Sequence, residues 1–119
     1  PGTAWFMARA RAAMTGDIEG YRMEISRRQD GTISLVIRAM RGIDSLDLYA
    51  GRVPQSPNFP PDVVQLEVVA IQNRIAFYAN EIYVMSLMGV DLLGGSVAFG
   101  VEPNTTAYFD NLRVVDLTP

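Results

Sequence analysis

The stretch TAYFDNLRVVDL, Thr106 to Leu117, decides the fold predicted for this chain. It is a run of β-branched and aromatic residues with a Phe-Asp-Asn step, and it comes one strand length after Ser96-Val97-Ala98-Phe99-Gly100. Runs of this kind, separated by turn residues at short intervals, are typical of β-sandwiches and barrels. The stretch therefore predicts the closing strand of an all-β, antiparallel β-sandwich.

The rest of the chain predicts further strands joined by short turns. Tyr21, Met23 and Ile25 alternate with polar residues, which is typical of a strand with one buried face. Asp30-Gly31 lies between two such runs and predicts a hairpin, because glycine tolerates the positive φ of the turn. A single meander of about nine strands is expected. Besides the closing strand, these are Ala4 to Met14, Gly20 to Ser26, Thr32 to Met40, Leu46 to Ala50, Val63 to Ile71, Arg74 to Tyr78, Ile82 to Leu87 and Ser96 to Val101.

Two of these strands and one loop carry more specific expectations. The composition of Ala4 to Met14 favours a helix by propensity, whereas the alternation from Ala8 to Ala12 favours a strand. The strand is preferred because the family resemblance described next implies one there. Gly51 to Asp62 contains four prolines, so it predicts a loop over one edge of a sheet. The nearly continuous apolar run Val63 to Ile71 predicts a central strand that is buried on both faces.

Four segments resemble, in order, bacterial concanavalin A-like (laminin G-like) modules. They are Tyr21 to Leu35, Val63 to Glu81, Ser96 to Gly100 and Phe109 to Val114. The resemblance implies a concanavalin A-like jelly roll in which residues 1–119 form one domain of a larger protein. It also implies that the first strands of the fold are missing before Pro1. The sheet edge beside the closing strand would then be filled by another chain or by a missing N-terminal segment.

Two turns depart from the glycine-containing turns of that family. Gln72-Asn73 and Asn80-Glu81 stand in their places. Asparagine tolerates positive φ better than other non-glycine residues, so Asn73 and Asn80 are expected to make these turns.

Composition excludes several classes of function. The chain has neither cysteine nor histidine, which removes thiolate chemistry and the usual general base near neutral pH. All 10 basic residues are arginine, and 13 acidic residues give a net charge of −3, which argues against a nucleic-acid partner. No run of about 18 apolar residues predicts a transmembrane segment.

No pair of carboxylates predicts catalysis. The resemblance extends to glycoside hydrolases, which need two carboxylates flanking the scissile bond. The close acidic pairs here, Asp17 with Glu19 and Asp44 with Asp47, fall in predicted turns, where aspartate is favoured for local hydrogen bonding. The chain is therefore predicted not to be an enzyme.

Arginines and tyrosines are the candidate ligand-binding residues. Arg9, Arg11 and Arg38 lie at alternating strand positions and would line one sheet face, with Tyr49 and Tyr78 as rings on which a sugar stacks. The alternative is that the tyrosines belong to the core and the arginines to a solvated face.

Asp110 is the candidate metal ligand. Phe109, Leu112 and Val114 share one face only if a bulge lies at Asp110-Asn111, and Asp110 would then cap the backbone there. The resemblance implies an alternative, because some relatives hold a structural calcium with an acidic residue on the closing strand. No other cofactor is expected.

Two functions are favoured by the sequence, beside a hydrolase whose catalytic residues lie outside this stretch or depart from known patterns. The first is a non-catalytic, extracytoplasmic or secreted binding module for glycans or adhesion. The second is a structural or assembly subunit, or a protein-interaction domain, whose open sheet edge pairs with a partner chain.

Overall fold

Eight β-strands make up the part of the chain that the structure describes. It is a computed structural model, and it describes residues 3–12, 18–41, 44–60, 62–88 and 96–101, which contain no helix. The prediction of an all-β antiparallel sandwich is confirmed, and β1 shows that the run from Ala4 forms a strand rather than a helix. The strands are β1 (Thr3–Ala12), β2 (Ile18–Arg27), β3 (Ile33–Arg41), β4 (Asp44–Arg52), β5 (Leu66–Ile71), β6 (Arg74–Ala79), β7 (Ile82–Leu87) and β8 (Ser96–Val101).

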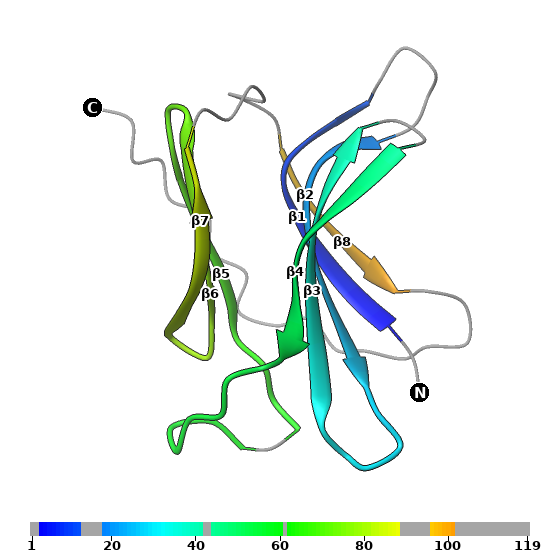
Figure 1. The fold of residues 1–119 in the computed structure, drawn as a ribbon, viewed down its shortest axis with the longest axis vertical. Helices are drawn as coiled ribbons and strands as arrows, with labels where there is room; N and C mark the ends of the chain where they lie inside the picture. Colours follow the sequence, from blue (N-terminus) through cyan, green and yellow to red (C-terminus); the bar gives the residue numbers. More distant parts are fainter. Residues whose placement is uncertain (1–2, 13–17, 42–43, 61, 89–95, 102–119) are drawn as a thin grey trace.

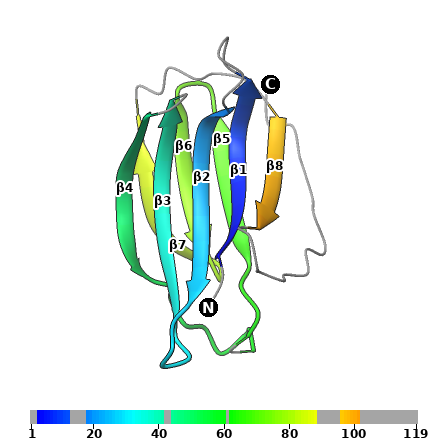
Figure 2. The same cartoon turned by 90° about the vertical axis from the view of Figure 1, so that its right-hand side faces the viewer.

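The strands form two antiparallel sheets that lie face to face (Figure 1, Figure 2). One sheet has the order β4-β3-β2-β1-β8, and the other has the order β5-β6-β7. Strand β8 pairs with β1, not with β7, so the predicted single meander is wrong. The pairing gives the second edge of β1 hydrogen-bond partners, which its buried backbone groups require.

The core lies between the sheets and is built from the inward positions of β2, β3 and β6. The largest fully buried side chains are those of Met23, Leu35, Ile37, Ile75 and Phe77. Each burial of this kind contributes about 1.5–3 kcal/mol relative to exposure. Because side chains alternate along a strand, the residues between these positions point to the two outer faces of the sandwich.

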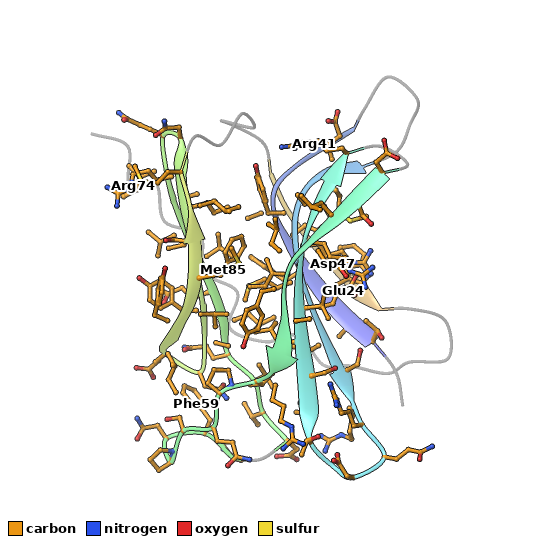
Figure 3. All side chains as sticks on the ribbon, viewed as in Figure 1. Glu24, Arg41, Asp47, Phe59, Arg74 and Met85 are labelled. Atoms are coloured by element: carbon orange, nitrogen blue, oxygen red, sulfur yellow. The ribbon has the colours of Figure 1, made fainter. Side chains whose placement is uncertain are left out.

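Figure 3 makes the two outer faces visible. Glu24 and Asp47 lie on the side of the five-stranded sheet that faces away from the three-stranded sheet, and Arg74 lies on the far side of the three-stranded sheet. Met85 lies on the inner side, where it packs against the core. The outer faces are therefore the two large surfaces on which these strands can present side chains to a ligand.

The β2–β3 hairpin has the predicted Asp-Gly turn. Gly31 has φ 88°, and the Asp30 carboxylate accepts hydrogen bonds from the Thr32 backbone N–H at 2.9 Å and from its hydroxyl at 2.6 Å. The hydroxyl, and after it the backbone N–H, holds the pKa of Asp30 below its ordinary value of 3.8.

The two turns of the three-stranded sheet differ from each other. Between β6 and β7, Asn80 and Glu81 both have positive φ, 51° and 65°, as a primed two-residue turn requires. Between β5 and β6, Gln72 and not Asn73 has positive φ, at 54°. The expectation that asparagine makes both turns is therefore wrong for the first. The Ile71–Arg74 pairing puts Gln72 at the first turn position, where the left-handed conformation is needed.

The proline-rich segment is a loop from Val53 onward, as predicted, and Asn80 ties it down. The side chain of Asn80, only 5% exposed, donates to the Pro54 carbonyl at 2.9 Å and accepts from the Gln65 N–H at 3.0 Å. The Asn80 N–H also donates to the Gln65 carbonyl at 2.8 Å. One buried amide thus fastens both ends of the loop to the β6–β7 turn.

The prediction of a doubly buried central strand at Val63 to Ile71 is wrong. Strand β5 begins only at Leu66, and none of its residues is fully buried. Within the described sheet β5 pairs with β6 alone, and β6 is the central strand. Val63 and Ile71 are among the exposed large hydrophobic residues. A continuous apolar run cannot by itself separate a buried strand from one with an apolar outer face.

Several expectations lie outside the described residues and stay predictions. They are the closing strand Thr106 to Leu117 with its bulge, the turn position of Asp17, and the role of Asp110. In the described ranges no helix is long and apolar enough to cross a membrane.

Candidate ligand-binding face

The five predicted ligand-binding residues do not form one site. Arg38 follows the buried Ile37 in β3 and points to the outer face of the five-stranded sheet, whereas Tyr78 follows the buried Phe77 in β6 and points to the opposite side of the molecule. Arg9 and Arg11 lie in β1, but the structure describes only their backbone. A single surface that includes both Arg38 and Tyr78 is therefore not formed.

Arg38 is held by two carboxylates on neighbouring strands. Its Nε lies 3.1 Å from Asp47 Oδ1 on β4, and one terminal nitrogen lies 3.6 Å from Glu24 Oε2 on β2. Asp44 and Asp47, expected in a turn, lie in β4, where the β3–β4 pairing puts Asp47 opposite Arg38. The guanidinium is thus neutralised by residues of its own sheet, and this weakens its role as a ligand-binding group.

The same face continues across β2 to β1. Arg22 Nε lies 2.9 Å from Glu24 Oε1, and the Arg22 guanidinium lies 4.8 Å from the centre of the Trp5 ring. The side chains of Arg22 and Glu24 are only 14% and 12% exposed, which is low for charges on an outer face. The charges of Arg22 and Glu24 and the ring of Trp5 therefore find their partners within the sheet itself.

Trp5 is also covered from the β8 side. A Cβ atom placed on Gly100 would lie 2.7 Å from Trp5 Cζ2, so the indole lies directly over that glycine. With Arg22 against it as well, the ring is packed between neighbours, and a sugar has little of it to stack on.

Tyr49 belongs to the inner side of the sandwich. It pairs opposite the buried Ile37 and packs partly buried against the core. Its hydroxyl lies 2.7 Å from the position that a Cβ on Gly51 would take. The ring thus covers the end of the core, which is the alternative role considered for this tyrosine.

Tyr78 is in a different setting, because it forms an aromatic pair on the outer face of the three-stranded sheet. It pairs across from Tyr83 on β7, with ring centroids 5.8 Å apart and an interplanar angle of 72°. Tyr83 is 56% exposed, and its hydroxyl is hydrogen-bonded to the Ser86 hydroxyl at 2.8 Å. Edge-to-face geometry contributes about 0.5–1.5 kcal/mol beyond area burial and keeps the two rings in fixed orientation.

A bulge in β7 places Tyr83 beside Tyr78. The pairing shifts between Phe77–Met85 and Tyr78–Tyr83, so that Val84 is an extra residue on β7. On the two sides of Val84, Met85 faces the core and Tyr83 faces outward. Alternation alone gives these two residues the same face, so sequence reasoning had no signal for this pair beyond the presence of Tyr83.

Other groups surround the pair on this face. Glu67 of β5 lies directly opposite Tyr78 and is exposed. Ile71 and Tyr83 are both large exposed hydrophobic residues. The face thus offers an oriented ring pair, a serine hydroxyl and a carboxylate, a combination suited to an amphipathic ligand with an apolar face and polar edges.

One hollow lies at the end of the β3–β4 hairpin, with a volume of about 210 Å³, lined by Ala39, Arg41, Asp44, Ser45 and Leu46. The Arg41 guanidinium donates to the hydroxyl of the buried Tyr21 at 3.3 Å and lies 5.6 Å from its ring centre. Arg41 thereby satisfies a buried hydroxyl, which is a structural role.

Within the described ranges, no three acidic residues lie together in an arrangement that would hold a metal ion. Family models, curated proteins and solved structures were all compared with this chain, and none of them matches it.

Proposed function

We propose that this chain is a non-catalytic glycan-binding module that works outside the cytoplasm, with the outer face of its three-stranded sheet as the binding surface. One observation carries the proposal: Tyr78 and Tyr83 form an edge-to-face ring pair in which Tyr83 is exposed and Tyr78 is half-buried. Pyranose rings present an apolar face that stacks on aromatic rings, while their hydroxyls need polar partners at the edge. Ser86 and Glu67 supply such partners beside the pair.

The contrast with the other outer face supports this choice of surface. Arg38 and Trp5 have the residue types of a sugar site, but their binding groups are engaged by Asp47, Arg22 and Gly100. The resemblance to concanavalin A-like modules, which include lectins, agrees with a glycan ligand, and fold alone does not select one.

The assembly alternative concerns the sheet edge beside the closing strand, which lies outside the described residues, and two of the described edge strands are poorly suited to pairing. Strands β4 and β7 each carry a bulge, and β4 adds the charges of Asp44, Asp47 and Arg52. Bulges and charges on outer strands are common devices against edge-to-edge pairing.

A glycan array with the purified domain, followed by titration of a soluble hit, tests the proposal. Tyr78→Ala and Tyr83→Ala are each expected to weaken binding at least about tenfold, since stacking anchors of this size dominate such surfaces. Arg38→Met, on the opposite outer face, is the matched control and should leave affinity unchanged. Loss of binding in the control, or full binding by both tyrosine variants, would refute the assignment of this face.

The array is run with and without calcium. Asp110 is the candidate calcium ligand. Glycan binding that needs calcium in the native protein and is lost in Asp110→Asn would support that role. Binding that is the same under both conditions would leave Asp110 with its backbone-capping role.

A further inference from the structure

We infer that Glu67 selects the charge of the glycan at the Tyr78–Tyr83 pair, so that sugars with protonated amino groups bind better than neutral sugars and acidic sugars bind worst. The inference rests on the proposed function and adds the ligand class. Its starting point is the β5–β6 pairing, which puts exposed Glu67 directly opposite Tyr78. Side chains in such a pair have Cβ atoms about 4.5–5.5 Å apart.

The charges along this sheet are unevenly distributed. Arg74 is the only basic residue in β5, β6 and β7, and it lies at the β5–β6 turn, at the far end of the outer face (Figure 3). Tyr78 lies four positions further along β6, which is about 13 Å along an extended strand. That distance exceeds the Debye length of about 8 Å at physiological salt. Glu81, in contrast, is exposed in the turn that follows β6. Among the charged residues of β5, β6, β7 and the turns between them, the one paired directly with the ring pair is therefore a carboxylate, that of Glu67.

This arrangement discriminates between sugars that stack equally well. A protonated amine at the edge of a stacked ring can donate a charge-assisted hydrogen bond to Glu67 and lies near electron-rich aromatic faces. A uronic acid in the same pose would bring its carboxylate against that of Glu67. For a solvent-exposed pair, one such interaction changes affinity by roughly two- to fivefold.

The test is calorimetric titration of the purified chain with three soluble oligosaccharides of equal length at physiological ionic strength and mildly acid pH. They are a chitosan hexamer, cellohexaose and a galacturonic acid hexamer. The expected order of affinity is chitosan, then cellohexaose, then galacturonate. Glu67→Gln should lower the chitosan-to-cellohexaose ratio by about threefold and raise galacturonate binding, with cellohexaose affinity nearly unchanged.

Arg74→Gln is the control for net charge, because it changes the charge of the same face without touching the ring pair. It should leave the three affinities in the same ratio. Because Glu67→Gln changes the net charge from −3 to −2 and Arg74→Gln changes it to −4, opposite shifts of similar size in the affinity ratios would mean that the net charge sets the preference, and would overturn the inference.

The outcomes distinguish failure of the charge selection from failure of the proposed glycan-binding function. Tyr78-dependent binding with no change of ratio in Glu67→Gln refutes the charge selection and leaves the glycan-binding proposal standing. Absence of binding to all three oligosaccharides, together with silence on the array, refutes both.

Discussion

The two outer faces of this sandwich use similar residue types to opposite effect. On the five-stranded sheet, the Arg22 guanidinium lies against Trp5, and Glu24 bridges Arg22 and Arg38. On the three-stranded sheet, Tyr78 and Tyr83 contact each other edge to face, and Tyr83 is exposed to solvent. The first face thus holds its charges and its tryptophan in contacts within the sheet, whereas the second leaves one ring of its pair exposed. The presence of aromatic and charged residues on a sheet is therefore a weaker indication of a binding site than the state of their partners.

The contrast is tested most severely within β6, where adjacent residues face opposite ways. Phe77→Ala removes a fully buried ring from the core and is expected to lower the free energy of unfolding by about 3–5 kcal/mol. Tyr78→Ala should cost much less stability and act on glycan affinity. Urea denaturation followed by circular dichroism measures the free energy of unfolding of both variants. Equal destabilisation by the two variants would mean that Tyr78 is a core residue and that its face is not available to ligand.

The packing of the five-stranded face can be broken at Gly100. A Cβ at this position would lie 2.7 Å from Trp5 Cζ2, so Gly100→Ala must displace the indole, at a cost of about 1–3 kcal/mol for overpacking. Trp5 is the single tryptophan of the chain, and its fluorescence reports on this face alone. A shift of the emission maximum with unchanged glycan affinity is expected. If affinity fell as well, the two faces would not be independent.

Glu24→Gln tests the self-satisfied charges of that face. The substitution keeps the side-chain shape but removes the charge that bridges two arginines, and we expect a loss of about 1–2 kcal/mol in unfolding free energy. The effect should shrink in high salt, because these contacts are electrostatic. Arg27→Gln, in the exposed part of β2, serves as the comparison. Stability that Glu24→Gln leaves intact would show that the network adds nothing to the fold.

The smallest expected effect is at the β2–β3 turn, remote from both outer faces. Hydrogen bonds from Thr32 lower the pKa of Asp30 in the folded state, so its stabilising contribution is present above the unfolded value, near 3.8, and is lost as pH falls through the folded value. Asp30→Ala should make stability slightly less dependent on pH in that acid range. Near neutrality, the stability of the variant should vary with pH in the same way as that of the native protein. Denaturation midpoints measured across this range check the sign, and a steeper acid dependence in the variant would contradict it.

Sequence reasoning predicted the strands well where local signals agree. Alternation along Tyr21, Met23 and Ile25 identified β2, and Asp30-Gly31 identified its hairpin, because side-chain period and turn chemistry act over a few residues. The prediction is wrong for Val63 to Ile71, where the apolar run indicates a doubly buried strand but no residue of β5 is fully buried. It also missed that β8 returns to β1.

The candidate site was only partly accessible in the same way. Tyr78 was named as a stacking residue, but Arg38 and Tyr49 were grouped with it although they lie on the far outer face and on the inner side. The partner of Tyr78 depends on a bulge at Val84 that changes the register of β7 by one residue. A shift of one residue reverses which face each side chain occupies, and no local sequence pattern predicts such a shift here.

By itself, the sequence determined the class of the fold, the approximate positions of the described strands, the Asp-Gly turn, and the absence of histidine and cysteine chemistry, because these follow from composition and from interactions between near neighbours. The tertiary structure decided which strands pair within each described sheet, which charges neutralise one another, and which two tyrosine rings come together on the outer face. These outcomes depend on contacts between residues far apart in the chain, where register and sheet order, not residue type, choose the partners.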